Sequence, residues 1–363
     1  MINVTKSFLP PLEQYVGYLK GIWEREHLTN HGPLVNELED KLRAYFGVKH
    51  FFFVNNGTIA LQIAIKALDI KGEVITTPFS YVATTSCIVW EQATPVFVDI
   101  DPLTFTIDPS KIEAAITSKT SAILATHVYG IPCNVDAIKV IADKYGLKII
   151  YDAAHAFGVK YNDTSILNNG DISTLSFHAT KLFHTVEGGG ITTNDDELAH
   201  RISYMRNFGH KGQEEFWGLG INGKNSEFHA AMGLCIFSKM EEILINRKIL
   251  SETYDRYLHE MNLAVHRPLL PKGISYNYAY YPVVFESEKQ LITIKESLNA
   301  ASIYPRRYFY PSLSKLPYLT SSHRMEISES IAERILCLPL YHDLSVDAIY
   351  SICNFISKTM NLK

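Results

Sequence analysis

One lysine of this chain has a sequence context that favours chemistry. Lys181 lies between a run of small, hydroxylated and aromatic residues, Ser176–Thr180, and a glycine cluster, Gly188–Gly190. Glu187 is the only acidic residue close to it in the sequence. A lysine held in an apolar, desolvated site has a lowered pKa and becomes a nucleophile, as Schiff-base chemistry with a carbonyl cofactor requires. Most lysines are surface residues without such a role, so the interpretation depends on whether the rest of the chain can hold that cofactor.

A short polar segment, Asn55–Thr58, has the features of a phosphate site. It follows a buried strand predicted over residues 48–54 and leads directly into an apolar helix predicted from residue 59. The free backbone N–H groups at a helix N-terminus, together with the positive end of the helix dipole, favour an anion there. The segment therefore indicates a phosphate site, with a plain strand-to-helix turn as the alternative.

Strands and helices alternate through the first half of the chain. Strands are predicted over residues 48–54, 73–77, 96–98, 121–126 and 147–151, and helices over residues 33–46, 59–65, 79–85, 108–116 and 134–146. This alternation predicts an α/β domain with a mostly parallel central sheet, in which ligands bind at the carboxyl ends of strands. Tyr81, Asp152 and Ser176–Lys181 each follow a predicted strand, so we expect them to meet Gly57 and Thr58 in one crevice. Tyr81 would there either belong to the core or stack on a planar ligand.

The remainder of the chain predicts a second, smaller α/β domain. A glycine-rich strand ends at Thr193, a helix covers about residues 194–207, and a long helix runs from Ser226 beyond Ile243. Composition changes near residue 245, so we predict a large domain over residues 1–245 and a small C-terminal domain over residues 246–363. Strands near 276–285 and 303–309 and helices near 289–298 and 346–357 are predicted for the small domain.

Several functional classes are disfavoured by composition and spacing. The 363 residues carry a net charge of −4, which argues against nucleic-acid binding. No apolar run approaches the roughly 20 residues that span a bilayer, and no signal-peptide pattern starts the chain, so we expect a cytoplasmic protein without a membrane segment. The five cysteines and 14 histidines show no metal-ligand spacing, so no metal site is predicted. A Gly-x-Gly-x-x-Gly match at Gly218–Gly223 does not follow a predicted strand, which disfavours a dinucleotide site.

Several motifs occur in the order found in one enzyme family. They are Asn56-Gly57-Thr58, Pro78–Thr84, Val98–Pro102, Asp152–Ala156, Ser176–Lys181, Glu187-Gly188-Gly189 and Ser226-Glu227. With them the chain resembles, over nearly its whole length, the DegT/DnrJ/EryC1/StrS family of nucleotide-sugar aminotransferases. The resemblance implies the fold type I, or aspartate aminotransferase-like, fold of pyridoxal 5′-phosphate (PLP) enzymes and a homodimer with shared active sites. It also implies a nucleotide-linked keto sugar and the glutamate/2-oxoglutarate pair as substrates.

The resemblance further implies roles for individual residues. Lys181 matches the lysine that forms a Schiff base with PLP and then moves a proton between the sugar carbon and the cofactor. Asp152 matches the carboxylate that pairs with the pyridine nitrogen, so that the ring acts as an electron sink. The other cofactor matches are Gly57, Thr58 and Ser176 at the phosphate, Tyr81 stacked on the ring, His155 near the ring hydroxyl, and Asn222 reaching the phosphate from the neighbouring subunit. The candidate substrate contacts are His178, Lys224, Tyr308 and Phe309.

The position of amination is inferred from two further similarities. Ser176-Phe177-His178 and Arg306–Pro311 resemble members that aminate C4 of a 4-keto-6-deoxy sugar, in particular dTDP-4-keto-6-deoxyglucose, for O-antigen or other surface glycans. Members that aminate C3 tend to have tyrosine at the position of His178, so C3 amination of a 3-keto sugar is the alternative. Dehydratase relatives carry histidine in place of the lysine, and Lys181 disfavours that reaction. Lys224-Asn225 replaces the family's common Arg-Met pair, which changes the donors that face the nucleotide sugar.

Overall fold

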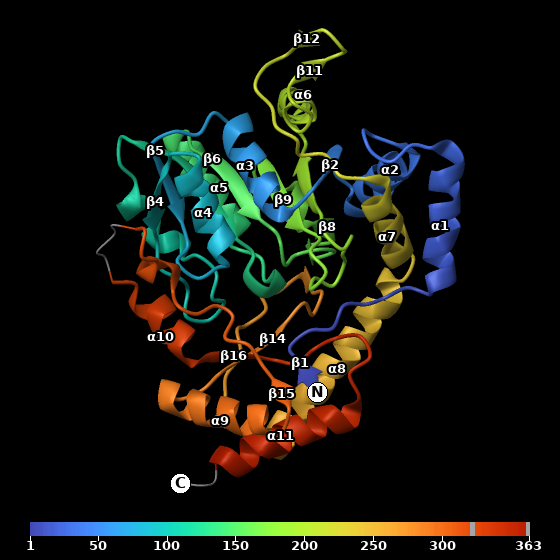
Figure 1. Cartoon of the computed structure of the whole chain (residues 1–363). Coiled ribbons are helices and arrows are strands. Elements are labelled where there is room, and N and C mark those ends of the chain that lie inside the picture. The colour runs from blue at the N-terminus through green and yellow to red at the C-terminus, as the bar shows by residue number, and fades with distance from the viewer. Residues whose placement is uncertain (320–323, 361–363) are drawn as a thin grey trace.

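The computed structural model describes residues 1–319 and 324–360, and its centre is a seven-stranded sheet (Figure 1). The strand order is β2 (His50–Val54), β10 (Gly189–Thr193), β9 (Ile172–Ser176), β6 (Lys148–Asp152), β5 (Thr120–Thr126), β3 (Glu73–Thr76) and β4 (Thr94–Phe97). Neighbouring strands are parallel except at β10, which is antiparallel to both β2 and β9. This confirms the predicted α/β class and the mostly parallel sheet.

Two sets of helices cover the two faces of the sheet (Figure 1). The first set packs with Phe52 and Val54 of β2 and consists of α3 (Gly57–Ala67), α4 (Val82–Trp90) and α6 (Asp196–Met205). The second set packs with Phe51 and Phe53 and consists of α1 (Leu12–Arg25), α2 (Pro33–Phe46), α5 (Val135–Tyr145) and α7 (Glu227–Phe237). Alternate residues of one strand thus serve two apolar layers, because side chains alternate across a sheet.

The C-terminal part of the chain builds a separate apolar cluster. The elements of this part are α8 (Met240–Glu260), β14 (Tyr281–Val284), α9 (Glu288–Ala300), β15 (Ile303–Tyr304), α10 (Glu326–Arg334), β16 (Ile335–Leu338) and α11 (Val346–Met360). All except α10 contribute to the cluster, since Ile331 and Ala332 of α10 pack in the apolar layer of α2 and α7. Tyr254, Leu291 and Ile352 lie in this cluster, and β14 pairs with β16. β15 pairs with β1 (Ile2–Asn3), so the N-terminus also lies in this part of the molecule (Figure 1).

The smaller elements lie in loops. β7 (Lys160–Tyr161) pairs with β8 (Thr164–Ser165) and with β13 (Ile274–Ser275), and β11 (His210–Lys211) pairs with β12 (Glu215–Phe216). The 3₁₀ turns are η1 (Pro109–Lys111), η2 (Glu113–Ala115), η3 (Val128–Gly130), η4 (Ile166–Asn168) and η5 (Leu313–Lys315). The pair η1 and η2 stands in place of the single helix predicted over residues 108–116.

The helix predicted from Ser226 is divided in the structure. Lys239 has non-helical backbone angles, φ −112° and ψ 2°, between α7 and α8. Ser238 Oγ donates to the carbonyl of Cys235 at 2.7 Å, a bond of the kind that competes with the helix ladder. α8 then continues through residues 245 and 246 without a break, so the predicted domain boundary lies inside a helix. The division into two domains stays a prediction.

Two strands of the C-terminal part are shorter than predicted. β14 begins only at Tyr281, because Tyr278 has a positive φ of 52° that interrupts an extended chain. β15 ends at Tyr304, because the following residue, Pro305, has no N–H to donate to a ladder. The backbone of Arg306 still exchanges hydrogen bonds with Cys337 as an isolated bridge.

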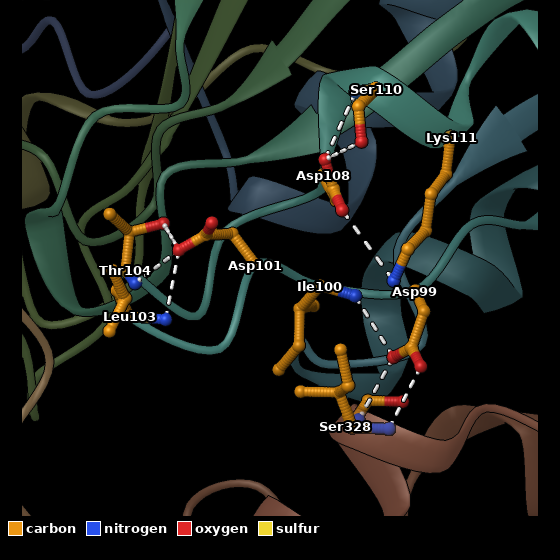
Figure 2. A network of polar contacts seen from close by, with 10 residues as sticks. Asp99, Ile100, Asp101, Leu103, Thr104, Asp108, Ser110, Lys111 and Ser328 are labelled. Carbon is orange, nitrogen blue, oxygen red and sulfur yellow. Dashed lines mark hydrogen bonds and ion pairs between the residues drawn. The ribbon is translucent and has the colours of Figure 1, made fainter.

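Asp99 joins the central sheet to α10. Its carboxylate, just after β4, accepts the backbone N–H of Ile327 at 2.8 Å and that of Ser328 at 2.9 Å (Figure 2). These N–H groups belong to the first turn of α10, where no intrahelical acceptor exists. The nearby Asp101 and Asp108 bond instead to residues of their own loop (Figure 2). Asp99 therefore fixes α10 to the edge of the sheet that carries the cavity described below.

Among residues 1–319 and 324–360, no helix combines the length and apolar character needed to cross a membrane.

Candidate active site

A cavity of about 610 Å³ opens at the carboxyl ends of the parallel strands. Most of the residues predicted from the sequence line it: Gly57, Thr58, Tyr81, Asp152, His155, Ser176, His178, Lys181, Tyr308 and Phe309. The strands β2, β6 and β9 end at the same edge of the sheet, and this edge brings residues together that are more than one hundred positions apart in the chain. The expected convergence on one crevice is therefore observed.

The N-terminus of α3 forms one end of the cavity. Asn56 caps the helix, since its Oδ1 accepts the N–H of Ile59 at 2.8 Å. This leaves the N–H groups of Gly57 and Thr58 without an acceptor inside the helix. A side chain at Gly57 would not fit, because its Cβ would lie 2.9 Å from the Cβ of Ser176. The glycine thus keeps the backbone open beside the Ser176 hydroxyl, and this arrangement fits a phosphate group.

Asp152 ends β6 and is 5% exposed. Its Oδ2 accepts the Thr84 hydroxyl at 2.7 Å and its Oδ1 accepts the N–H of Ala154 at 3.1 Å. Burial raises the pKa of Asp152, while these two donors and the charge of Lys181 act in the opposite direction. The carboxylate is therefore held in one orientation, with little water to screen its charge.

Lys181 lies in the loop after β9. The loop is fixed by backbone bonds, from the N–H of Phe177 to the Gly188 carbonyl at 2.7 Å and from the N–H of Lys181 to the His178 carbonyl at 2.8 Å. Burial lowers the pKa of the Lys181 amine, and the charge of Asp152 partly offsets this effect. A lysine with a lowered pKa beside a buried carboxylate has the properties of a nucleophilic amine.

His155 and Tyr81 flank the cavity in different ways. His155 is buried, its Nδ1 accepts the N–H of Tyr129 at 3.1 Å, and its ring stacks on Phe309 at 5.6 Å between centroids. Burial lowers the pKa of His155 far below its ordinary value, so the neutral ring carries its proton on Nε2. Tyr81 is 58% exposed and precedes α4. Tyr81 is therefore a cavity residue and not a core residue, which favours the interpretation that it stacks on a planar ligand.

His178 lies at the cavity together with Glu187. Its Nδ1 is 2.8 Å from Thr180 Oγ1, and its Nε2 is 3.6 Å from Glu187 Oε1. Both side chains are largely exposed to the cavity opening. This pair presents a donor and an acceptor of the kind that binds sugar hydroxyl groups.

Two predicted residues lie outside the lining of this cavity. Lys224 Nζ donates to Asn222 Oδ1 at 2.9 Å and lies over the Phe208 ring at 4.5 Å from its centroid. The carbonyl of Asn222 accepts the Asn55 side chain at 3.1 Å. The segment 222–224 thus contacts the turn before α3. The side chains of Asn222 and Lys224 bond to each other and do not line the cavity. Their assignment to a site shared between subunits stays a prediction.

Sequence reasoning missed cavity residues that the C-terminal part contributes. Tyr280, Tyr304 and Arg306 line the wall opposite the sheet, next to Tyr308 and Phe309. Tyr280 lies in the tyrosine-rich run 276–281, which the pattern predicted only as a strand. The run gave no signal for a site, because tyrosine is common in strands and only Tyr280 among its four tyrosines lines the cavity.

The residues of the cavity fit PLP as a group. The open backbone at Gly57 with Ser176 suits its phosphate, the buried carboxylate of Asp152 suits its ring nitrogen, and the desolvated amine of Lys181 suits its carbonyl. No group of three or more His, Cys, Asp or Glu residues in the described part of the chain could hold a metal ion.

Comparisons with known proteins agree with this geometry. The chain matches the DegT/DnrJ/EryC1/StrS aminotransferase family over residues 13–357. It is 43% identical to dTDP-4-amino-4,6-dideoxy-D-glucose transaminase of Shigella dysenteriae and 41% identical to that of Escherichia coli, each over 98% of both chains. It is 35% identical to UDP-2-acetamido-2-deoxy-3-oxo-D-glucuronate aminotransferase of Pseudomonas aeruginosa, over 89% of both chains.

A solved structure shows the same architecture. DesI, crystallised in the presence of its TDP-sugar product, superposes with a TM-score of 0.93 at 31% identity, over 98% of this chain and 92% of that chain. The aminotransferase fold expected from the sequence is thereby confirmed. This chain belongs to the DegT/DnrJ/EryC1/StrS aminotransferase family.

Proposed function

We propose that this protein is a PLP-dependent aminotransferase that transfers the amino group of glutamate to C4 of a nucleotide-linked 4-keto-6-deoxy sugar, with dTDP-4-keto-6-deoxyglucose as the substrate. The convergence of Lys181, Asp152 and the N-terminus of α3 on one cavity carries the proposal. The name of the 43% identical relative supports the choice of sugar and of C4. C3 amination is the competing outcome, because the relative at 35% identity is named for a 3-oxo sugar.

PLP, when bound, supplies a reactive carbonyl and an electron sink. Gly57, Thr58 and Ser176 would hold its phosphate through backbone N–H groups and a hydroxyl. Asp152 would hold a positive charge at the ring nitrogen, since its two fixed donors leave the carboxylate no freedom to turn away. Lys181 would bond to the carbonyl and, when its amine is free, carry the proton between substrate carbon and cofactor.

The substrates would occupy the rest of the cavity. His178 and Glu187 are the proposed contacts for sugar hydroxyl groups, and Tyr308 and Phe309 provide an apolar wall for the deoxy part of the sugar. Asn222 and Lys224 are proposed to reach the site of a second copy of the chain, which would make the enzyme a homodimer.

The chemistry is tested first without a sugar. Protein reconstituted with PLP should be yellow, and borohydride should fix the cofactor on Lys181, which peptide mapping identifies. Lys181→Ala should lose both the fixation and the transamination of glutamate. Transamination by Lys181→Ala at the wild-type rate would refute the assignment.

The substrate is tested next with a panel of nucleotide-linked keto sugars and glutamate, and NMR identifies the aminated carbon. We expect an amine at C4 of the dTDP-linked 4-keto-6-deoxy sugar. An amine at C3 of a 3-keto sugar would overturn the C4 proposal and keep the aminotransferase.

A further inference from the structure

The amine of Lys181 has a hydrogen-bond partner from the C-terminal part of the chain. Lys181 Nζ donates to the hydroxyl oxygen of Tyr280 at 3.4 Å. Tyr280 is 8% exposed and lines the cavity beside Tyr308. The reactive amine and its partner therefore come from opposite sides of the cavity, one from the sheet edge and one from the segment before β14.

The backbone around Tyr280 is fixed by two buried polar side chains. Asn277 Nδ2 donates to the carbonyls of His155 at 2.8 Å and Phe157 at 2.9 Å, and Asn277 Oδ1 accepts the N–H of Ala279 at 3.1 Å. Arg247 of α8 donates to the carbonyls of Tyr278 at 2.9 Å and Ala279 at 2.6 Å. Residues on both sides of the cavity thus determine where the tyrosine lies.

Two aromatic neighbours hold the Tyr280 ring in place. It meets the His155 ring edge-on at 4.9 Å and 69° and the Tyr308 ring at 5.8 Å and 86°. Burial raises the pKa of the phenol, so the hydroxyl stays neutral. A neutral, immobile oxygen can accept an N–H of the lysine without competing for its proton.

The hydroxyl groups of neighbouring buried tyrosines have structural acceptors. Tyr254 donates to the Pro339 carbonyl at 2.9 Å, and Tyr281 donates to Asp255 Oδ1 at 2.6 Å. Tyr280 differs because its hydroxyl contacts the reactive lysine. A tyrosine needed only for packing would not have to place its oxygen there, since phenylalanine would fill the same volume.

We propose that Tyr280 is a positioning residue for Lys181: it accepts one N–H of the free amine and directs the nitrogen lone pair toward the substrate carbon. The inference rests on the proposed function, in which the free amine of Lys181 carries the proton. With PLP bound, Lys181 would carry a proton from the glutamate carbon to the cofactor, and in the sugar half-reaction it would carry a proton from the cofactor to the sugar carbon. Tyr280 would neither gain nor lose a proton.

The test uses PLP-loaded Tyr280→Phe, which keeps the ring and removes the acceptor. The control is Tyr278→Phe, because that ring stacks edge-on against Tyr276 outside the cavity lining. Single-turnover rates are measured separately for glutamate and for the keto sugar, with unlabelled and α-deuterated glutamate. Thermal unfolding and borohydride fixation on Lys181 verify that the variant is folded and loaded.

We expect Tyr280→Phe to slow both half-reactions by about three- to tenfold, the equivalent in rate of one ordinary hydrogen bond, with little change in either KM. The deuterium isotope effect on the glutamate half-reaction should increase, because the proton-transfer step becomes more rate-limiting. Wild-type rates and isotope effect in a loaded variant would overturn the inference, as would a defect limited to one substrate, which would indicate direct substrate binding. Failure of the wild-type enzyme to fix PLP on Lys181 would instead refute the proposed function.

Discussion

Lys181 and Asp152 are each placed in a region where a charge is costly. Burial lowers the pKa of the lysine and raises that of the aspartate, so each group is moved toward its neutral form. Their mutual attraction opposes both shifts. A cofactor with a positively charged ring nitrogen would offset the cost at Asp152, whose two hydrogen-bond donors, Thr84 and Ala154, are neutral.

The burial of His127 leads to a prediction of how the stability of the protein depends on pH. The residue is fully buried after β5, stacks on Tyr151 at 4.6 Å, and accepts the N–H of Cys133 at Nδ1. Burial lowers the pKa of His127 to about 3. Below about pH 6.5 the unfolded chain takes up a proton here that the native protein excludes until about pH 3. Stability should therefore fall with decreasing pH in that window, by about 2 kcal/mol from this residue at pH 5.

Urea unfolding at pH 7.5 and pH 5 measures this contribution. His127→Asn keeps an acceptor for Cys133 and removes the titration, so the variant should lose about 2 kcal/mol less than wild type between the two pH values. His259→Asn, at an exposed position of α8, should behave as wild type. Equal acid sensitivity of His127→Asn and wild type would contradict the assignment.

At the scale of elements, α10 depends on a cap from another part of the chain. Met325 precedes α10 without a side-chain cap, and Asp99 satisfies the N–H groups of Ile327 and Ser328. Asp99→Ala should lower the free energy of unfolding by about 1–2 kcal/mol, because a helix loses its cap. Amide hydrogen exchange in α10 should become faster. Asp101→Ala removes only hydrogen bonds to the N–H groups of Leu103 and Thr104 in its own loop, so it should leave exchange in α10 unchanged.

The capping residues show which part of the site a sequence can predict. Asp99 and Glu227 occur in motifs that identified the family, yet neither lines the cavity. Glu227 is buried and accepts the N–H groups of Leu34 and Val35 at the start of α2. Sequence motifs therefore indicated the fold and the family, but they did not separate residues that hold elements together from residues that face the ligand.

The cavity residues at the strand ends were predictable from the sequence, and those on the opposite wall of the cavity were not. Parallel strands share one carboxyl edge, so residues at their ends, such as Asp152 of β6 and Ser176 of β9, had to converge. Tyr280 and Arg306 reach the cavity through the packing of the C-terminal elements, since Tyr280 directly precedes β14 and the backbone of Arg306 bridges to Cys337 of β16. That packing depends on long-range contacts, such as those of Arg247 and Asn277, for which the sequence has no periodic signal.

At the scale of the whole molecule, distant parts of the chain build one cavity. Asn3–Thr5 line it together with the strand ends and Tyr280. The pairing of β1 with β15 and the bond from the Leu340 N–H to the Val4 carbonyl at 3.0 Å hold the N-terminal segment there. The site thus depends on contacts between the first residues and the last elements of the described chain.

The segment from β12 to Leu219 exposes large apolar side chains. Phe216, Trp217 and Leu219 are exposed by 61%, 52% and 73%, although they are large and apolar. We predict that a second copy of the chain covers this segment, since neighbouring exposed apolar groups favour an interaction surface. The segment leads directly to Asn222 and Lys224, so covering it with a second copy would bring these two side chains to the interface.

Complementation between an inactive chain, Lys181→Ala, and a weakened chain, Asn222→Ala, tests whether Asn222 serves the site of its partner. Asn222→Ala should weaken the enzyme through its proposed phosphate contact, and Lys181→Ala should abolish activity. In a mixed dimer, the intact Lys181 of one chain would meet the intact Asn222 of the other and form one complete site. Co-expression at equal levels should therefore restore about a quarter of the wild-type activity, as expected for random pairing in a twofold dimer.

The alternative, in which Asn222 acts in its own subunit, has its own structural basis, because the N–H of Asn55 donates to the Gly223 carbonyl at 2.9 Å within one chain, beside α3. If Asn222 acted in its own subunit, no mixed dimer would contain a complete site, and the co-expressed variants would show no more activity than Asn222→Ala alone.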